Sequence, residues 1–333
     1  MNIVIKKKKL VRNSQATKKV AAPVKKSVKK VVAIHTEQKP VQKKILTNHK
    51  FQILTRHPSY AELRKNLPRM PFKLIARFGS TTEVADAMSK GGKTLEINEI
   101  KAIRNSASKL LMKKCFTSAG VKTANWFTVR AGKICIADDQ NKIIVQDKLP
   151  YPLIVKSHHG SRGEGNSFIK DQSELTRFMS SRDMSNYIIE EYMTSMRREY
   201  RLHINAINNT CFYTCRKLLK KDCPEENKFQ KHSDTCIWAI ESNPAFDRPD
   251  NWQEVVDECV KAIKSVGLDV GACDVIMQTS TSKKTGKKRD KPEFIICETC
   301  SAASMGNITT ERYVIELPKI ARQKAISLGL IKS

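Results

Sequence analysis

Lys156 and the glycine-rich turn behind it are the residues whose types and spacing most directly indicate chemistry. The apolar run at residues 152–155 predicts a strand that ends in this lysine, and the turn occupies residues 159–165. Glycines in such a turn let the backbone fold over an anion with its N–H groups pointing inward. The pattern predicts a nucleotide-phosphate site that comprises Lys156, Gly160, Ser161, Gly163 and Gly165.

The turn also nearly fits the P-loop pattern, in which a lysine inside the glycine loop reaches the phosphates. Residues 160–167 supply the two outer glycines and the final serine, but Asn166 occupies the lysine position. A P-loop is therefore excluded, and a lysine that precedes the loop favours a two-stranded flap that closes over the phosphates.

Asp274 and Glu298 are single acids within otherwise apolar runs that predict strands. A buried carboxylate without a partner is costly, so each requires a cation or a hydrogen-bond donor. Magnesium binds such carboxylates together with substrate phosphates, and it spreads the charge that develops during phosphoryl transfer. The alternative is a pair of structural acids in salt bridges, but the upstream lysine and glycine turn favour magnesium.

Two helices that position these residues follow from the spacing of apolar side chains. The first covers residues 106–119 and carries Lys109 in its first turn. Its expected buried side comprises Leu110, Leu111, Cys115 and Phe116. The second covers residues 252–266, with a continuous apolar stripe and Gly267 as its stop.

Strands account for most of the remaining body. An Asn208-Asn209 pair between two of them is a strong hairpin signal. The expected strands cover residues 72–78, 187–193, 199–207, 210–218, 271–278 and 293–298. The last two are joined by residues 279–292, a loop with six Lys/Arg residues and one acid.

Positive charge is concentrated at the start of the chain. Residues 1–50 hold 15 of the 61 Lys and Arg residues but only one acid, and the formal net charge of the whole chain is +28. Residues 1–46 have too little apolar content to offset the entropy of ordering, so we expect a disordered tail. It either tethers the protein to nucleic acid or another polyanion, or is a solubilising or processed extension.

No apolar run is long enough to span a bilayer and no secretory signal is recognisable, so we expect an intracellular, cytoplasmic protein without a membrane partner. Ten cysteines scattered through such a chain favour reduced thiols over disulfides. Structural zinc is disfavoured, because the cysteine pairs 211/215 and 297/300 do not form a clustered ligand set.

The chain resembles the ATP-grasp superfamily over about residues 70–325, most closely the ribosomal-protein glutamate ligases and D-alanine:D-alanine ligase. It is also similar to small ATP-grasp proteins of phage genomes, for which the location would be the host cytoplasm. The resemblance rests on the order and approximate spacing of Lys109, Lys156, the glycine turn, residues 190–193, Glu199, Asp274 and Glu298. It implies two α+β subdomains that clasp ATP at residues 106–330, after a short α/β segment at residues 47–105.

By position, the resemblance implies that Lys109 and Lys156 hold the ATP phosphates and that Glu199 binds the ribose. It also implies a hinge beside the adenine, with the carbonyl of Glu191 and the N–H of Met193 on the base edge. The implied hinge residues are Glu190, Glu191, Tyr192 and Met193.

For the reacting groups, the resemblance implies that Asp274 and Glu298 bind Mg²⁺. Arg201 and Arg216, expected on paired strands facing the phosphate end, are implied to bind the acylphosphate or the substrate carboxylate.

The chain departs from the family at Cys300, where an asparagine normally reaches the second metal. Strand alternation predicts Cys300 on the same face as Glu298 and Cys297 on the other face, but a thiol is a poor magnesium ligand. Three interpretations follow. The enzyme works with one tightly bound metal, or Asn307 or water replaces the missing ligand, or the protein is a decayed enzyme that still binds nucleotide.

The implied activity is ATP-dependent, ADP-forming ligation of an unidentified carboxylate to an amine. The basic tail and residues 283–291 favour an acidic substrate such as a glutamate-rich peptide, or one bound to nucleic acid. The alternative is a catalytically weak nucleotide-binding protein that these basic segments hold on nucleic acid. A nucleic-acid ligase is disfavoured, because the nearest approach to its K-x-D-G motif has Cys223 in place of the glycine.

Overall fold

The structure is a computed structural model that describes residues 48–332 except 138–142, 161–164, 197, 225–234 and 283. The predicted disordered tail, residues 1–46, lies outside the described residues. Residues Leu46–Ser333 form one compact unit. The predicted boundary between residues 105 and 106 falls inside this unit and stays a prediction.

A small parallel sheet lies at the start of this unit. Its strands are β1 (Phe51–Leu54), β2 (Leu74–Arg77) and β3 (Leu95–Ile97). Two helices pack here: α1 (Ala61–Asn66) and the C-terminal α6 (Asn307–Ser327). Their shared core includes Tyr60, Phe78, Tyr313 and Leu317. The expected short α/β segment is therefore confirmed, and it is completed by the far end of the chain.

A six-stranded antiparallel sheet contains the lysine and the glycine turn. Its order is β6 (Ile143–Val145), β5 (Lys133–Ala137), β4 (Trp126–Arg130), β9 (Tyr187–Glu191), β7 (Leu153–Ser157) and β8 (Ser167–Ile169). Leu175 of α4 (Gln172–Ser180) packs into its core beside Leu153 and Ile189. Because β7 and β8 pair on either side of the glycine turn, the predicted two-stranded arrangement is confirmed, while its closure over phosphates stays a prediction.

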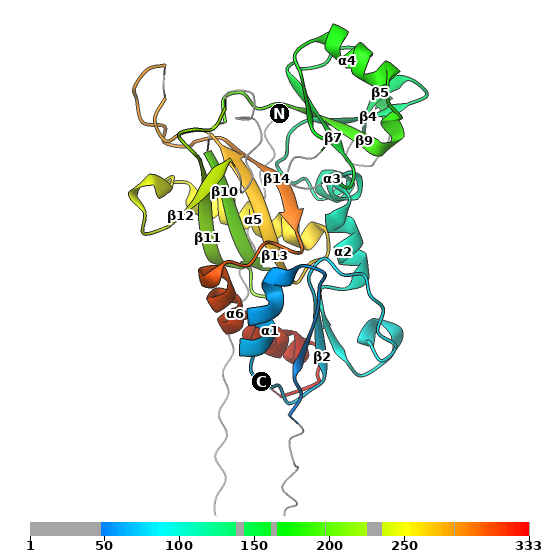
Figure 1. Cartoon of the computed structure of the whole chain (residues 1–333), viewed down its shortest axis with the longest axis vertical. Helices are drawn as coiled ribbons and strands as arrows, with labels where there is room; N and C mark the ends of the chain where they lie inside the picture. Colours follow the sequence, from blue (N-terminus) through cyan, green and yellow to red (C-terminus); the bar gives the residue numbers. More distant parts are fainter. Residues whose placement is uncertain are drawn as a thin grey trace, which may run out of the picture. The chain divides into compact units, whose positions relative to one another are not determined.

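A five-stranded antiparallel sheet contains the two predicted metal ligands. Its order is β12 (Cys236–Ile240), β11 (Thr210–Leu219), β10 (Arg198–Asn205), β13 (Val270–Met277) and β14 (Phe294–Cys300). Helix α5 (Trp252–Ser265) packs on one face, as Figure 1 shows for β10 and β13. The core on that side includes Tyr200, Leu202, Val255 and Val275. The opposite face, referred to below as the open face, carries Arg201, Lys217 and Asp274, and α6 packs against its other end.

The helix predicted at residues 106–119 is two helices, α2 (Ile100–Ala107) and α3 (Lys109–Ser118). Ser108 separates them, and its hydroxyl accepts a hydrogen bond from the N–H of Leu111 as the cap of α3. The predicted buried side was wrong at Leu111, which is 40% exposed. Met112 and Lys113 face the interior instead, together with the correctly predicted Phe116.

The other elements follow their sequence signals closely. The hairpin of β10 and β11 is confirmed, with Asn209 in the left-handed region at φ 61°. Helix α5 ends before Gly267, which has φ 86°. None of the described helices combines the length and apolar character that a membrane span requires.

Candidate active site

The predicted phosphate lysine belongs to a buried charge cluster. Lys156 on β7 donates from Nζ to Oε2 of Glu190, on the adjacent strand β9, at 2.8 Å. Nζ of Lys113, on α3, lies 3.5 Å from the same oxygen. The side chain of Lys113 is fully buried, and those of Glu190 and Lys156 are 4% and 15% exposed. One carboxylate therefore serves two ammonium groups, which leaves a surplus of one positive charge.

The pKa shifts in this cluster have a common origin. Burial alone would raise the pKa of Glu190, but Lys113 and Lys156 outweigh it and hold that pKa below its usual value. Burial also lowers the pKa of Lys113. In Lys156 the charge of Glu190 and its neighbours outweighs burial, so the pKa of Lys156 is raised. The ion pair of Lys156 with Glu190 is thus the tighter of the two.

Lys109 connects α3 to the glycine turn. As predicted, it lies in the first turn of its helix, and its Nζ donates to the carbonyl of Gly160 at 2.5 Å. Its backbone N–H donates to the carbonyl of His158 at 2.9 Å. Gly165 has φ 73° at the other end of the turn, while the predicted Ser161 and Gly163 lie outside the described residues. Lys109 and Lys156 therefore approach the turn from two elements.

The predicted hinge begins where β9 ends. The N–H groups of Glu191 and Tyr192 donate to the carbonyls of Asn125 and Pro152, both at 2.9 Å. Met193 packs against an apolar cluster of Ala124, Met196, Ile276 and Ile295. Because Ile276 and Ile295 belong to β13 and β14, this cluster joins the hinge to the five-stranded sheet.

Charged side chains pair across neighbouring strands on the open face. Arg201 donates from Nε and Nη2 to the two oxygens of Asp274 at 2.7 and 2.8 Å. Nζ of Lys217 donates to Asp274 Oδ2 at 2.9 Å and also bonds Glu199. The register explains two of these contacts, because Arg201 lies opposite Asp274 and Glu199 lies opposite Lys217, whereas Lys217 reaches Asp274 across β10.

Asp274 is held in its charged form by this arrangement. Burial would raise its pKa, but Arg201 and Lys217 outweigh burial and hold the pKa of Asp274 well below its usual value. The pKa of Lys217 is raised, because Asp274 and Glu199 outweigh its burial. The carboxylate is therefore ionised at neutral pH, as a metal ligand must be.

Glu298 lies directly opposite Asp274 in the pairing of β14 with β13. Its half-buried carboxylate makes no hydrogen bond or ion pair with another described side chain. Cys300 lies opposite Ala272 and so shares this face, as predicted. Burial raises the pKa of the Cys300 thiol, so it is neutral at pH 7.

The prediction that Cys297 points to the other face was wrong. The register of β13 and β14 shifts between Asp274 and Val275, which leaves Cys297 as an extra residue in a bulge. Burial raises the pKa of Cys297 to about 12, with further effects from the charges of Lys156, Glu199, Glu190 and Lys113. Because the bulge breaks the alternation of side chains, Cys297 does not take the face opposite to Glu298.

The expectation that Arg216 faces the phosphate end was also wrong. Arg216 lies opposite Tyr200, whose side chain belongs to the core under α5. Its Nη1 donates to the carbonyl of Ala245 at 2.6 Å, and its guanidinium lies 5.7 Å from the Tyr200 ring centre. Since side chains alternate along a strand, the open face receives the next residue, Lys217.

The residues present fit a magnesium ion with two carboxylates. Asp274 offers about four acceptor positions and uses three, and Glu298 uses none among the described side chains. No group of three or more His, Cys, Asp and Glu side chains within the described ranges is arranged to hold a metal. Phosphate and water oxygens would have to complete the coordination, as is usual for magnesium.

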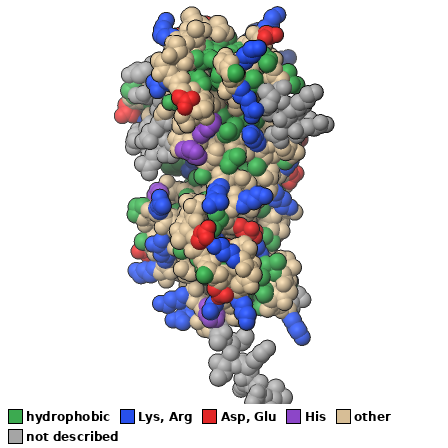
Figure 2. Space-filling view, turned by 90° about the vertical axis from the view of Figure 1, so that its right-hand side faces the viewer, with side chains coloured by type: hydrophobic (Ala, Val, Ile, Leu, Met, Phe, Trp, Pro, Cys, Tyr) green, Lys and Arg blue, Asp and Glu red, His purple; other side chains and the backbone are tan. Residues whose placement is uncertain are grey.

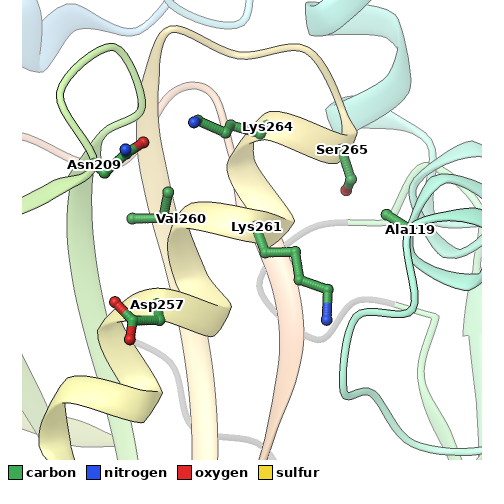
Figure 3. A pocket seen from close by; sticks show the side chains of 7 residues that line it. All are labelled: Ala119, Asn209, Asp257, Val260, Lys261, Lys264 and Ser265. Carbon is green, nitrogen blue, oxygen red and sulfur yellow. The ribbon is translucent and has the colours of Figure 1, made fainter. Parts of the chain in front are cut away.

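A surface pocket of about 560 Å³ lies elsewhere. Figure 3 shows its lining, in which residues of α5 lie between Asn209 on one side and Ala119 on the other. None of its lining residues belongs to the predicted site: Ala119, Asn209, Asp257, Val260, Lys261, Lys264 and Ser265.

Lys113 and Lys217 were not predicted from the sequence as part of the site, and Cys297 was predicted on the wrong face. Lys113 carried a detectable signal, because a lysine four residues after Lys109 shares its helical face. Lys217 carried a signal as well, because it lies two residues after Cys215 on β11, which places both side chains on the same face of the strand. The sequence around Cys297 carried no such signal, since the position of a bulge depends on how the strand pairs with its neighbour.

Solved structures of three enzymes are similar to this chain. D-alanine–D-alanine ligase from Bacillus anthracis, complexed with ATP, shares 15% identity, with 76% of this chain and 81% of that chain covered at a TM-score of 0.48. N5-carboxyaminoimidazole synthetase from Staphylococcus aureus shares 17% identity, with 73% of this chain and 56% of that chain covered at a TM-score of 0.47. Biotin carboxylase from Campylobacter jejuni shares 14% identity, with 75% of this chain and 55% of that chain covered at a TM-score of 0.48. No curated protein sequence matches the chain.

A protein-family model matches residues 112–285, which is just over half of the chain. Its description is "Carbamoyl-phosphate synthase L chain, ATP binding domain". The matched segment begins in α3 and runs through β13, so it includes Lys113, Lys156, Glu190 and Asp274. The chain therefore belongs to the carbamoyl-phosphate synthase L chain ATP-binding domain family, within the ATP-grasp superfamily.

Proposed function

We propose that this protein is an ATP-dependent, ADP-forming ligase that joins a carboxylate to an amine through an acylphosphate. The observation that carries the proposal is the pairing of two charge clusters. The six-stranded sheet presents Lys156 with a surplus of positive charge, and the five-stranded sheet presents two in-register carboxylates, Asp274 and Glu298. Cationic groups for phosphates and acidic groups for a metal are what phosphoryl transfer requires.

The nucleotide would bind between the hinge and the glycine turn. Among the described residues, the N–H of Met193 has no hydrogen-bond partner, so it is available to the adenine edge. The cluster around Ile276 and Ile295 supplies an apolar surface for the purine. Lys109 and Lys156 would hold the phosphates, and Glu199 the ribose.

Asp274 and Glu298 would hold the metal. When bound, Mg²⁺ draws charge from the phosphate oxygens and so favours displacement at the γ-phosphorus. The protein's own part is to keep both carboxylates ionised and on one face, which Arg201 and Lys217 do for Asp274.

Arg201 and Lys217 are the groups that we assign to the reacting carboxylate. A carboxylate oxygen attacks the γ-phosphorus and ADP leaves; the amine nitrogen then attacks the acyl carbon, phosphate leaves, and the amine loses a proton. Both cations lie beside the metal ligands, so they can orient the carboxylate and stabilise the charge on the acylphosphate. They take the place of the pair Arg201 and Arg216 expected from the sequence.

The test is isothermal calorimetry with a non-hydrolysable ATP analogue, with and without Mg²⁺. We expect magnesium-dependent binding that Lys156→Ala abolishes and that Lys170→Ala, at the exposed end of the same flap, retains. ADP release would then be measured over a panel of carboxylates and amines. Absence of nucleotide binding under both conditions would contradict the proposal.

The neutral thiol of Cys300 favours a second candidate, a nucleotide-binding protein with weak or no turnover. Nucleotide binding that is normal while no carboxylate stimulates ADP release would support it. The proposed contact with a polyanion through residues 283–291 is compatible with either candidate. In that loop Lys288 and Lys291 already pair with Asp250 and Glu254, so contact would fall to the tip at Lys284 and Lys287. On the face shown in Figure 2, Lys and Arg side chains are spread over the surface rather than gathered in one patch.

A further inference from the structure

Trp238 lies beside the two cations assigned to the reacting carboxylate. It belongs to the edge strand β12 and pairs with Lys217 of β11, so it projects from the open face. Its ring centre is 5.1 Å from the guanidinium carbon of Arg201 and 5.6 Å from Nζ of Lys217. An aromatic ring therefore flanks both cations at the sheet edge.

Trp238 is the most exposed of the three tryptophans of the chain. Trp126 is 4% exposed in the interior, and Trp252 packs edge-on against Tyr200 and Phe246. Trp238 is 41% exposed and belongs to none of the core clusters. A large aromatic surface left in water next to buried charges costs free energy that a bound apolar group would recover.

The charges on the open face determine which ligand fits there. Among the described side chains, three acids, Glu199, Asp274 and Glu298, lie beside two cations, Arg201 and Lys217, so these five groups together carry one net negative charge. A bound divalent cation reverses the balance to one positive charge. The face then accepts an anion, and the Trp238 ring excludes water from one side of both cations, which strengthens their bonds to a carboxylate.

We propose that Trp238 is a specificity-determining residue of the carboxylate site, and that the substrate carries a flat apolar or aromatic group next to its reacting carboxylate. Arg201 and Lys217 would hold the carboxylate while the flat group covers the exposed indole. This inference rests on the proposed function, because it assumes that the metal and nucleotide bind first.

The test uses simple carboxylates and does not require turnover. Saturation-transfer difference NMR would measure the Kd values of phenylacetate, acetate and glutarate for the full chain with Mg²⁺ and ADP. We expect phenylacetate to bind at least tenfold more tightly than acetate or glutarate, with the strongest saturation on its ring protons. Trp238→Ala should bring the three Kd values within about twofold of one another, and Trp238→Phe should keep most of the preference.

Ile237→Ala is the matched control, because Ile237 is the next residue of β12, is 54% exposed and points to the other face. It should keep the wild-type preference. Equal Kd values in the wild type, a preference for glutarate, absence of carboxylate binding, or a preference that survives in Trp238→Ala would each overturn the inference.

ADP binding measured by calorimetry on the same samples separates the two proposals. If ADP binds and phenylacetate is not preferred, only the role of Trp238 falls. If ADP does not bind to the wild type, the proposed function falls and this inference falls with it.

Discussion

Lys113 and Lys156 converge on the same carboxylate oxygen of Glu190, one from α3 at 3.5 Å and the other from β7 at 2.8 Å. Lys113 is also hydrogen-bonded to Thr123 Oγ1, which donates to the carbonyl of Ile296 at 2.8 Å. Ile296 directly precedes the bulge that contains Cys297 and leads to Glu298. A continuous set of contacts thus joins the hinge carboxylate to the strand with the second predicted metal ligand.

Lys113→Met should weaken binding of a non-hydrolysable ATP analogue by roughly tenfold and leave adenosine binding unchanged. Without Lys113, the carboxylate of Glu190 is neutralised by Lys156 alone. The positive charge of Lys156 is then no longer available to the phosphates. Calorimetry with both ligands measures the difference. Lys113→Arg should restore much of the affinity, and Lys114→Met, its neighbour on α3, should bind like the wild type. Equal losses for ATP analogue and adenosine would indicate a merely structural lysine.

Glu298→Gln should remove the magnesium dependence of nucleotide binding. The change keeps the size of the side chain but removes the charge opposite Asp274, and magnesium binds carboxylates far better than amides. Nucleotide affinity with Mg²⁺ should then fall to the value measured without it. Glu293→Gln, an exposed acid just before β14, is the control. A magnesium effect that survives in Glu298→Gln would rule out this carboxylate as a ligand.

Arg201→Lys and Arg216→Lys should differ sharply because they lie on opposite faces of one sheet. Arg201→Lys loses the two-oxygen contact with Asp274 and should lower turnover by about 10²–10³-fold, as for removal of a positioned donor. Arg216→Lys should leave turnover nearly unchanged but cost about 1 kcal/mol of unfolding free energy through its lost bond to Ala245. Rates of ADP release and urea unfolding test this, and similar turnover losses would refute the assignment of faces.

His203 should make stability depend on pH between about 3 and 6.5. It is 1% exposed and contacts the hydroxyl of Tyr313, and burial together with Arg201 lowers the pKa of His203 to about 3. Between these values the unfolded chain binds a proton that the folded chain does not. Stability from this group is therefore complete above pH 6.5 and declines as the pH falls.

Urea unfolding at pH 7 and pH 5 measures the effect of His203 at pH values above those at which most carboxylates titrate. His203→Gln should reduce the difference in unfolding free energy between the two pH values by about 2 kcal/mol. His159→Gln, an exposed histidine, should leave that difference unchanged. An unchanged difference in His203→Gln would show that this histidine is not held neutral.

The sequence by itself determined the order of the chemical groups and the elements that carry them. Single acids in apolar runs located β13 and β14, and the Asn208-Asn209 pair located the hairpin of β10 and β11. The order of Lys156, the glycine turn and the hinge was also read directly from the sequence. These signals are local, since each depends on residues only a few positions apart.

Only the tertiary structure decided which side chains meet. Asp274 pairs with Arg201, 73 residues away, and with Lys217, 57 residues away, because β10 lies between β11 and β13. The bulge at Cys297 depends on the partner strand, and the burial of Lys113 depends on the packing of α3 against β9 and β14. Strand alternation gives two faces, but the register and the packing of α5 determine which one stays open, and so why Lys217 rather than Arg216 faces the site.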